Sequence, residues 1–373
     1  MARNRVIYQS EALYVSEDLS STASGKHTQL ERVQSANYNF SISRQDINQY
    51  GQLARIDSLV LEPPTVALDF TYYLTDGFNE RALGFYVKTG AAQSEGNFAS
   101  GHMIASSGRN FYISTVSEGN DATGINGGGV NSVIGIGNAY LSDYTLDLAV
   151  GSLPTVSVTM EGANINSDTT ISNAAGSISG IASPAINPQD GSILNTLSNV
   201  VLKPANSGAS NISALRPGDV TVDITNFDGT GLADLAGSED GIHIQSASLS
   251  LPLSRSPLQR LGTKFPYARS VDFPVSATLS VNAIVNEIAA TNLANILNDQ
   301  SEKDIILTLK GPDGSSNKMV YTLKGCKLDS ESFSSSIGSN KTVDLTFSTQ
   351  IGGPNDGLHG VLVSGANNTT IFA

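Results

Sequence analysis

RVQSANYNFSISRQDINQYG, residues 32–51, is followed 211 residues later by a similar stretch, HIQSASLSLPLSRSPLQRLG, residues 243–262. Six of the 20 aligned positions are identical, against about one or two expected from composition. Six more positions exchange one apolar residue for another. The identical positions are Gln34/Gln245, Ser35/Ser246, Ala36/Ala247, Ser43/Ser254, Arg44/Arg255 and Gly51/Gly262. The match indicates an internal duplication.

The repeat continues without a gap into the next predicted strand, where residues 62–75 (EPPTVALDFTYYLT) align with residues 273–286 (FPVSATLSVNAIVN). Each copy then has apolar residues at i, i+4, i+7 and i+8, a spacing that predicts one short helix. These residues are Phe78, Ala82, Phe85 and Tyr86 in the first copy and Ala289, Leu293, Ile296 and Leu297 in the second.

Two further strands follow in each copy, NFYISTV and SVIGIGNAYL in the first and DIILTLK and MVYTLKGCKL in the second. The offset between the copies is now 187, so the first copy has gained 24 residues (211 minus 187) between positions 76 and 132. We expect the extra residues in AAQSEGNFASG or in the Gly-rich SEGNDATGINGGGVNS. A further strand leading into each copy fits RVIYQSEALYV in the first and GDVTVDITNF in the second.

The order of elements predicts a mainly β protein with two tandem β-rich domains, each with one flanking α-helix. The scarcity of charged residues and the abundance of Gly, Ser, Thr and Asn favour strands and turns in the same way. Residues 166–213 are poor in charge and rich in Ser, Ala, Asn and Gly, which predicts a linker or extended arm. A small β-hairpin domain around ILNTLSNVVL is the alternative. The predicted boundaries are 1–165 and 214–356 for the two copies, 166–213 for the linker and 357–373 for a C-terminal tail.

Alternate residues of a strand face opposite sides, and in both copies one side is apolar and the other is short and polar. The predicted core residues are Ala36, Tyr38, Phe40 and Ile42, Val66, Leu68, Phe70, Tyr72 and Leu74, and Ala247, Leu249, Leu251 and Leu253. The opposite face has Ser and Asn but no Lys or Arg. An ordinary solvent-facing surface is one explanation, but such surfaces usually carry more Lys and Glu.

Composition limits the classes of function. The net charge of −13 argues against a protein that grips nucleic acid, because affinity for phosphate depends mainly on Lys and Arg. It is compatible with a protein that lets nucleic acid slide past. The sequence has no apolar run of the roughly 18 residues needed to cross a bilayer, and its first residues lack the apolar segment of a signal peptide. We therefore expect synthesis and retention in a cytoplasm and no membrane partner.

No catalytic, metal or cofactor site is predicted. His27, His102, His243 and His359 lie far apart in the sequence without metal-binding spacing. The single cysteine, Cys326, excludes an intrachain disulfide and a cysteine-based metal cluster. The Gly-rich NGGGV lacks the Lys and Ser/Thr of a phosphate-binding loop. The acidic stretch NFDGTGLADLAGSED departs from the calcium-loop pattern, and no nucleophile elbow is present. We expect no enzyme and no cofactor.

The duplicated element order, together with stretches such as SISRQDINQYGQLARIDSLVLEPPTVALDF, resembles the major tail tube proteins of tailed bacteriophages, in particular the long-tailed kind with a duplicated tube domain. The resemblance covers residues 1–165 and 214–356. It implies β-sandwich domains with a flanking helix, stacked in rings whose inner strands form one continuous barrel around a DNA channel. For chains with two tube domains, it implies a homotrimer with pseudo-sixfold symmetry.

The resemblance also implies the partners and the place of the protein. The chain would be made in the host cytoplasm and would assemble with itself into the tail of the virion. There it would meet other tail proteins, namely the tape measure, terminator and baseplate, and would let DNA pass without tight binding. The polar strand faces would line the channel. The expected channel-lining residues are Ser35, Asn37, Asn39, Ser41, Asp69, Thr71, Ser246, Ser248, Ser250 and Ser280.

Two other functions fit parts of the sequence. A baseplate hub or other tail-end protein would also use paired tube domains, but hubs usually carry sizeable inserted domains. An adhesin-like binding module could share a β-sandwich rich in Ser, Thr and Asn. Adhesins more often have aromatic patches, whereas this chain has no Trp and only 6 % aromatic residues.

Overall fold

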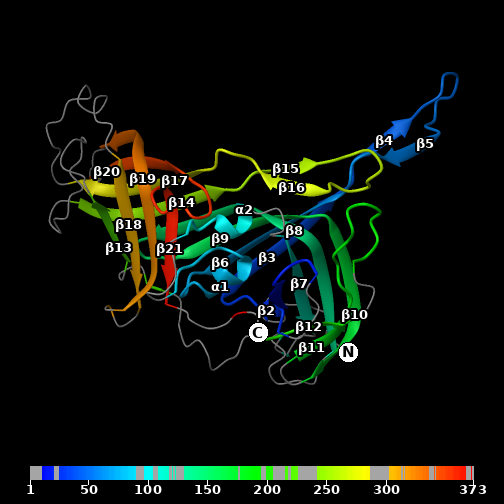
Figure 1. Ribbon diagram of the computed structural model, residues 1–373, viewed down its shortest axis with the longest axis horizontal. Helices are drawn as coiled ribbons and strands as arrows, with labels where there is room; N and C mark the ends of the chain where they lie inside the picture. Colours follow the sequence, from blue (N-terminus) through cyan, green and yellow to red (C-terminus); the bar gives the residue numbers. More distant parts are fainter. Residues whose placement is uncertain are drawn as a thin grey trace.

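The computed structural model is mainly β and has two halves side by side, with one hairpin projecting from an end (Figure 1). We call residues 11–204 the first half and residues 215–371 the second half. The structure describes residues 11–20, 25–89, 96–103, 108–116, 120, 122, 130–174, 177–194, 199–204, 215–216, 220–225, 242–285, 302–311, 314, 316–335, 340, 342–366 and 371.

The first half contains twelve strands and two short helices among its described residues. The strands are β1 (Glu11–Ser16), β2 (His27–Gln29), β3 (Val33–Ser41), β4 (Arg44–Ile47), β5 (Asp57–Val60), β6 (Thr65–Tyr73), β7 (Arg109–Val116), β8 (Val130–Ala149), β9 (Thr155–Gly162), β10 (Asn164–Ala174), β11 (Ser177–Ile181) and β12 (Val200–Leu202). The helices are α1 (Phe78–Leu83) and α2 (Ser100–Met103).

The second half contains nine strands in its described part. They are β13 (Val220–Thr225), β14 (Ile242–Pro252), β15 (Arg255–Leu258), β16 (Ala268–Val271), β17 (Ser276–Val285), β18 (Lys303–Lys310), β19 (Asn317–Ser334), β20 (Thr342–Gln350) and β21 (Gly360–Gly365).

One antiparallel sheet runs through both halves, and we call it the central sheet. Its strand order is β3-β6-β9-β8-β14-β17-β20-β19. A flanking sheet of order β2-β1-β7-β8-β10 lies in the first half, and one of order β13-β18-β19-β21 lies in the second. The strands β8 and β19 are long because the first part of each pairs in a flanking sheet and the rest pairs in the central sheet.

Strand pairing follows the same register in the two halves. Asn37 lies opposite Asp69 in the first half, and Ser248 lies opposite Ser280 in the second. Ser248 is 211 positions after Asn37, and Ser280 is 211 positions after Asp69. The hairpins β4–β5 and β15–β16 also correspond at this offset, since Arg44 faces Val60 and Arg255 faces Val271. Even the bulge near the start of β3 recurs at the equivalent place in β14. The residue-for-residue alignment of the two stretches therefore holds in the folded chain.

The 24 extra residues of the first half fall in two places. Phe111 pairs with Ile136, and the equivalent pair in the second half is Ile305 with Leu323. These pairs give offsets of 194 for β7 and β18 and of 187 for β8 and β19. Seventeen residues (211 minus 194) are therefore gained before β7, and seven (194 minus 187) between β7 and β8. These two intervals contain the two stretches, AAQSEGNFASG and SEGNDATGINGGGVNS, in which the sequence led us to expect the extra residues.

One apolar core spans the two halves. The alternation predicted for β6 is confirmed, because Val66, Leu68, Phe70, Tyr72 and Leu74 are all buried. Between the halves, Phe85 stacks on Phe98 with ring centroids 4.1 Å apart. Phe98 also contacts the rings of Tyr144 from the first half and Tyr321 from the second. These aromatic contacts add to the sheet in holding the halves together.

The segment 166–213, predicted as a linker or extended arm, differs from that prediction where the structure describes it. Its β10 pairs with β8, β11 with β10 and β12 with β11. Ile178, Ile181, Val200 and Leu202 are buried in a second core against Tyr14 and Tyr112. Few apolar residues suffice here because β1, β7 and β8 also contribute side chains to this core. Part of the alternative, a strand at the end of ILNTLSNVVL, is present as β12.

Two further predictions need correction. Residues 357–373, predicted as a tail, include β21, which pairs with β19 and buries Val361 and Val363. The first predicted helix is shorter than expected, because α1 ends at Leu83 and Gly84 adopts φ +100°, a conformation that terminates helices. Phe85 and Tyr86 therefore lie beyond the helix. The second predicted helix, with Ala289, Leu293, Ile296 and Leu297, lies outside the described residues.

A buried carboxyl group lies where the halves meet. The Tyr72 hydroxyl donates to Glu80 Oε1 over 2.7 Å, and the Tyr144 hydroxyl lies 2.9 Å from that of Tyr321. Glu80 is fully buried, and its Oε2 has no hydrogen-bond partner among the described residues. Burial raises the pKa of Glu80 from 4.5 to about 7, against the opposing effect of the Tyr72 hydrogen bond. The protonated form is thus favoured in the folded chain.

We expect the stability of the chain to fall with rising pH because of Glu80. The raised pKa makes the folded state bind this proton more tightly than the unfolded state, so the contribution is complete below about pH 4.5 and is lost through pH 7. A shift of this size is worth about 3 kcal/mol. Glu80→Gln should remove this part of the pH dependence in urea unfolding measured from pH 5 to 8.5. Glu62→Gln, at an exposed carboxylate, should leave the dependence as it is, and equal slopes in wild type and Glu80→Gln would contradict the assignment.

Candidate functional site: the polar sheet face and its two edges

The ten residues predicted to line a channel share one face of the central sheet. Register places Ser35 opposite Thr71 and Asn37 opposite Asp69 on β3 and β6. On β14 and β17, Ser248 lies opposite Ser280. Because directly opposed residues point to the same side and every second residue follows, the face also includes Asn39, Ser41, Ser246 and Ser250.

Hydrogen bonds link the short side chains of this face across strands. Ser35 Oγ lies 2.7 Å from Thr71 Oγ1, and Thr159 Oγ1 donates to Asp69 Oδ1 over 2.8 Å. Ser248 Oγ donates to Asp147 Oδ1 over 2.6 Å. Such bonds hold the side chains close to the sheet, so the face is low and uniform.

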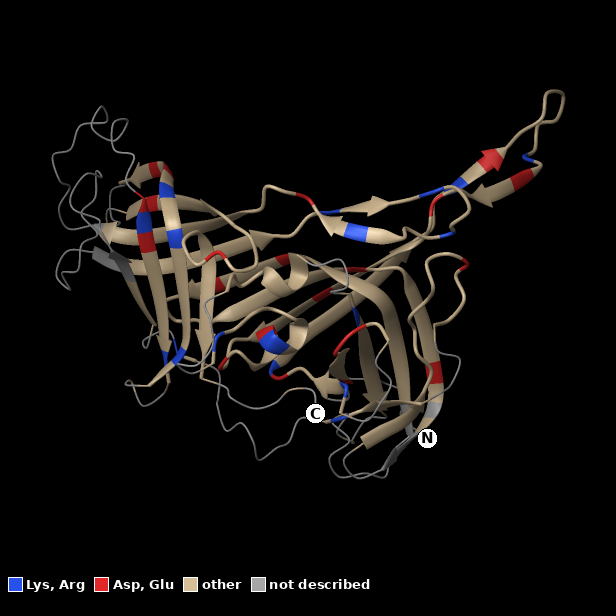
Figure 2. Cartoon of the chain, viewed as in Figure 1, with Lys and Arg blue, Asp and Glu red and all other residues tan. Residues whose placement is uncertain are grey.

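The charge on this face is mainly negative. Its paired residues in the described chain include the acids Asp69, Asp143, Asp147, Glu161 and Asp344, whereas Lys327 is the basic residue and lies at the border of the face. The strands of the sheet are otherwise mostly uncharged (Figure 2). A duplex that approached this face would meet acids and hydroxyls and few groups that bind phosphate.

The two halves of the central sheet are joined by β8 and β14. Leu249 pairs with Leu146 and Ser250 with Thr145, in an unbroken ladder from Ser246/Ala149 to Pro252/Asp143. Leu249, Leu251 and Leu146 are each no more than 1 % exposed. The junction is therefore a closed piece of sheet with its own apolar side.

The outer edges of the central sheet are the equivalents of this junction. β3 corresponds to β14, and the last part of β19 corresponds to the last part of β8. In the described chain, β3 pairs with β6 alone and residues 327–334 of β19 pair with β20 alone. Each outer edge of the central sheet is thus formed by the equivalent of one of the two strands that pair at the β8–β14 junction.

The prediction that Tyr38, Phe40 and Ile42 belong to the core is wrong for the single chain. They are 41 %, 57 % and 42 % exposed, whereas the equivalent Leu249, Leu251 and Leu253 are at most 1 % exposed. At the other edge, Phe333 is 47 % exposed while its equivalent Leu146 is buried. The difference arises because β14 has β8 beside it, whereas no described strand lies beside β3 on the side away from β6.

A transfer of the β8–β14 register to the edges brings complementary residues together. With offsets of 211 and 187, the pair Leu249/Leu146 becomes Tyr38/Phe333, and Ser250/Thr145 becomes Asn39/Ser332. The exposed aromatic residues would thus lie opposite each other on the apolar side, and the small polar residues on the other. Each edge would therefore supply the neighbouring strand that the other edge lacks.

The described residues offer no alternative site of recognisable chemistry. No group of His, Cys, Asp and Glu among them could hold a metal ion. His27 and His102 are buried, His359 lies on the surface beside Asp356, and the side chain of His243 is outside the description. Cys326 is buried, and burial raises the pKa of its thiol to about 12. The acidic stretch 226–240 lies outside the described residues.

Helices of the length and apolarity needed to span a bilayer do not occur in the part of the chain that the structure describes.

Comparison with known proteins adds no relative, since no protein-family model and no curated protein matches the sequence.

Sequence reasoning missed the acids Asp143 and Asp147 on the polar face. They lie on the second part of β8, whose residues alternate Tyr144, Leu146 and Leu148 inward with Asp143, Thr145 and Asp147 outward. That alternation is visible in the sequence. The shared use of β8 by two sheets is not, because it depends on a strand 100 residues away.

The matched pair Phe40 and Leu251 tests the assignment of the edges. Leu251→Ala should lower the free energy of unfolding of the dissociated chain by about 2–5 kcal/mol, as for other buried leucines. Phe40→Ala should change it by less than about 0.5 kcal/mol, as for other exposed positions. Urea unfolding at low protein concentration measures both. A large loss for Phe40→Ala would mean that β3 is already covered in the single chain.

Proposed function

We propose that the protein is a structural subunit of a phage-type tail tube, in which three chains close into a ring and rings stack around a channel for DNA. Each chain would supply two tube-like β-sandwich domains. The tail of a virion is the place that this proposal implies, with tape measure, terminator and baseplate proteins as neighbours.

The observation that carries the proposal is the agreement between the internal junction and the two edges. A chain whose ends are two complementary parts of a junction binds its own copies head to tail. Such contacts close into a ring if the rotation between copies closes, and otherwise continue as a filament. The internal junction already relates the two halves in the way that the next copy would follow.

Ring closure also explains why a duplicated chain is useful. Closure removes both sheet edges, each of which exposes main-chain groups that would pair with any other strand. With two halves per chain, three chains give six equivalent positions, the number implied by the resemblance to tail tube proteins. The central sheets of three chains would then form one continuous barrel.

The polar face supports a channel as the role of that barrel. The apolar side of the central sheet is covered by the flanking sheets, so the other side is left for the lumen. Short hydroxyl and amide side chains with scattered carboxylates would neither bind phosphate nor narrow the passage, and mild repulsion would keep a duplex away from the wall.

The ring can be tested by a disulfide across the proposed junction. Asn39→Cys with Ser332→Cys should link neighbouring copies, because directly opposed strand residues lie within the Cα separation that disulfides accept. Oxidation should give a ladder that ends at a covalent trimer on a non-reducing gel. Cys326 is buried and should not interfere. A ladder that ends at six would preserve the ring and contradict the threefold count.

Two control variants sharpen this experiment. Thr145→Cys with Ser250→Cys is the equivalent pair within the chain. It should form a disulfide inside one chain, so the chain should still run as a monomer on the non-reducing gel. Asn37→Cys with Ser332→Cys is two residues out of register and should link poorly. If the wild-type chain stays monomeric at high concentration and Asn39→Cys/Ser332→Cys forms no link, the proposal fails.

The channel can be tested by adding charge to the polar face. Asn39→Lys with Ser250→Lys should leave assembly intact but make the assembled particles retain duplex DNA at low salt, with retention lost as salt rises. Wild-type particles should release it. The control Ser179→Lys with Gln189→Lys adds the same charge at exposed positions away from this face. Equal retention by both double variants would show that the polar face is not the channel wall.

A further inference from the structure

The hairpin β15–β16 is seated against the first half of its own chain, and its contacts are specific. Arg255 Nε donates to the Leu141 carbonyl over 3.1 Å, and Arg255 Nη2 donates to the His102 carbonyl over 2.7 Å. The guanidinium lies over the ring of Tyr140, 5.2 Å from its centroid. The Leu253 N–H donates to the Ser142 carbonyl over 2.8 Å. Arg255 therefore fastens the hairpin to the middle of β8.

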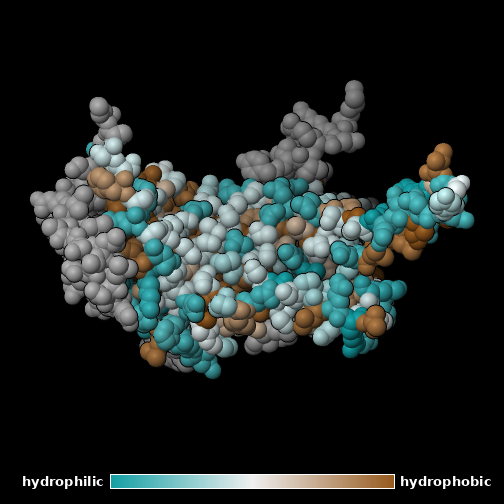
Figure 3. Space-filling view, turned by 90° about the horizontal axis from the view of Figure 1, so that it is seen from above, coloured by the Kyte–Doolittle hydropathy of each residue, from teal (hydrophilic) through white to brown (hydrophobic). Residues whose placement is uncertain are grey.

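The first hairpin, β4–β5, has the same register, but nearly all of its residues are exposed. We call residues 42–62 the arm, and it stands out from the body with apolar atoms at its tip (Figures 1 and 3). Ile42 is 42 % and Val60 45 % exposed, whereas the equivalent Leu253 and Val271 are 0 % and 6 % exposed. Tyr50 and Leu53 near the tip are fully exposed. The arm is thus similar in sequence to the docked hairpin β15–β16, but the described residues of its own half do not bury it.

Arg44 is the equivalent of Arg255 and one of the six identical positions of the repeat. It is exposed, while Arg55 on the same arm pairs with Asp46 over 3.0 Å. A guanidinium that is kept in both copies and fastened in one indicates the same role in the other.

The seat used by β15–β16 has an equivalent in the second half, and it is a cleft. The seat residues Tyr140, Ser142 and Glu161 become Lys327, Asp329 and Ser348 at an offset of 187. All three line a cleft of about 530 Å³ with Glu302, Asp356 and His359. With three carboxylates against one lysine, the cleft has the charge that an incoming arginine requires.

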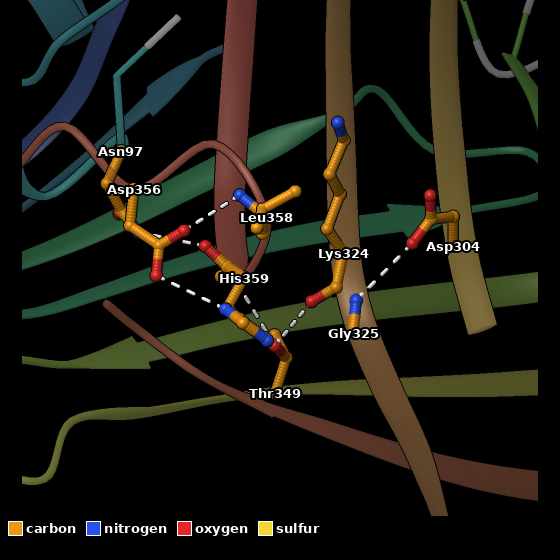
Figure 4. Close-up of polar contacts among 9 residues, drawn as sticks. Asn97, Asp304, Lys324, Gly325, Thr349, Asp356, Leu358 and His359 are labelled. Atoms are coloured by element: carbon orange, nitrogen blue, oxygen red, sulfur yellow. Dashed lines mark hydrogen bonds and ion pairs between the residues drawn. The ribbon is translucent and has the colours of Figure 1, made fainter. Parts of the chain in front are cut away.

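The floor and rim of the cleft are held by hydrogen bonds (Figure 4). Thr349 Oγ1 donates to the Lys324 carbonyl over 2.6 Å and accepts from the Gly360 N–H over 3.2 Å. His359 Nδ1 lies 3.2 Å from Asp356 Oδ2 at the rim. The cleft is therefore formed before anything occupies it.

A paired change of residues links the arm to this cleft. In the seated hairpin, Arg269 Nη1 contacts Glu161 Oε2 over 3.1 Å. At the equivalent positions, the arm has Ser58 and the cleft has Ser348. Both members of the ion pair are replaced together, so neither charge would be buried alone, an arrangement that would be costly.

From these observations we propose that the arm of one copy docks in the cleft of a second copy of this chain, with Arg44 as its fastening residue. The Arg44 guanidinium donates to the Leu328 carbonyl of the second copy and to the Ser58 carbonyl of its own arm, as Arg255 donates to Leu141 and Arg269. The inference rests on the proposed head-to-tail assembly and adds a second contact, separate from the β3–β19 junction.

The first test removes Arg44 and compares it with the other arginine of the arm. Arg44→Ala should raise the concentration at which the full chain is half assembled by about tenfold or more, as expected for the loss of charge-assisted hydrogen bonds. Arg55→Ala removes the same charge from the same arm and should change it by less than about twofold. Analytical ultracentrifugation over a dilution series measures both. The melting temperature of the dissociated chain should be unchanged in each, while Arg255→Ala should lower it.

The second test transplants the internal ion pair to the contact between copies. Ser58→Arg with Ser348→Glu should restore assembly in the Arg44→Ala background, and either single change should not. A double-mutant cycle isolates this coupling from effects on each side alone. Additive single effects, or equal effects of Arg44→Ala and Arg55→Ala, would overturn the proposal.

The two proposals can fail separately. If Asn39→Cys/Ser332→Cys links the copies but assembly is indifferent to Arg44 and to the transplanted pair, the arm docks elsewhere and the ring stands. If Arg44→Ala dissociates the particles and the transplanted pair restores them without any link at Asn39/Ser332, the arm contact stands and the strand junction falls. A wild-type chain that never associates overturns both.

Discussion

The antiparallel ladder between β8 and β14 is the interaction on which the rest of the structure depends. Every buried main-chain N–H and C=O group needs a partner, and this ladder supplies partners to the inner strands of both halves at once. It turns two separate sets of strands into one sheet. The aromatic contacts of Phe98 with Tyr144 and Tyr321, and the Glu80 network beside them, fill the space that the ladder creates.

The same requirement makes the two outer edges significant. Proteins usually protect an edge strand with Lys, Pro, a strong bulge or a covering loop. Residues 33–41 of β3 contain neither Lys nor Pro, and Tyr38 and Phe40 leave apolar surface exposed along this edge. Such an edge is a liability in a protein that stays monomeric. In the proposed ring it is an interface, where Pro would remove a main-chain donor from the ladder and Lys on the apolar side would be buried beside Tyr38 and Phe40.

Local pattern allowed much of this fold to be predicted. The gap-free offset of 211 correctly predicted that β3 and β6 correspond in register to β14 and β17, because strand register is determined by alternation and by the turns. Alternation also assigned Leu249 and Leu251 to the core. It could not show that Tyr38 and Phe40 are exposed, because alternation specifies the face of a residue and not whether a neighbouring strand belongs to the same chain.

Other features escaped prediction for different physical reasons. The strands β10 and β11 are rich in Ser and Asn, and they and β12 share a core with Tyr14 and Tyr112, so the composition of this segment resembles that of a linker. The helix α1 was extended too far because its apolar spacing continues past Gly84, whose positive φ ends it. The polar face was found from its residues, whereas the cleft around His359 required the folded positions of β18 to β21.

The two versions of the junction differ in a way that follows from when each would form. The internal one is made during folding, so it uses Leu249, Leu251 and Leu146, and the ion pair of Arg269 with Glu161 at its margin. The proposed external one must remain soluble before it closes. There Tyr38 and Phe333 replace leucines, and Ser58 and Ser348 replace the ion pair. Aromatic side chains supply large contact areas at low entropic cost when an interface forms, and serines lose little when they are desolvated. In the proposed assembly, one version of the repeated surface is thus suited to folding and the other to association between copies.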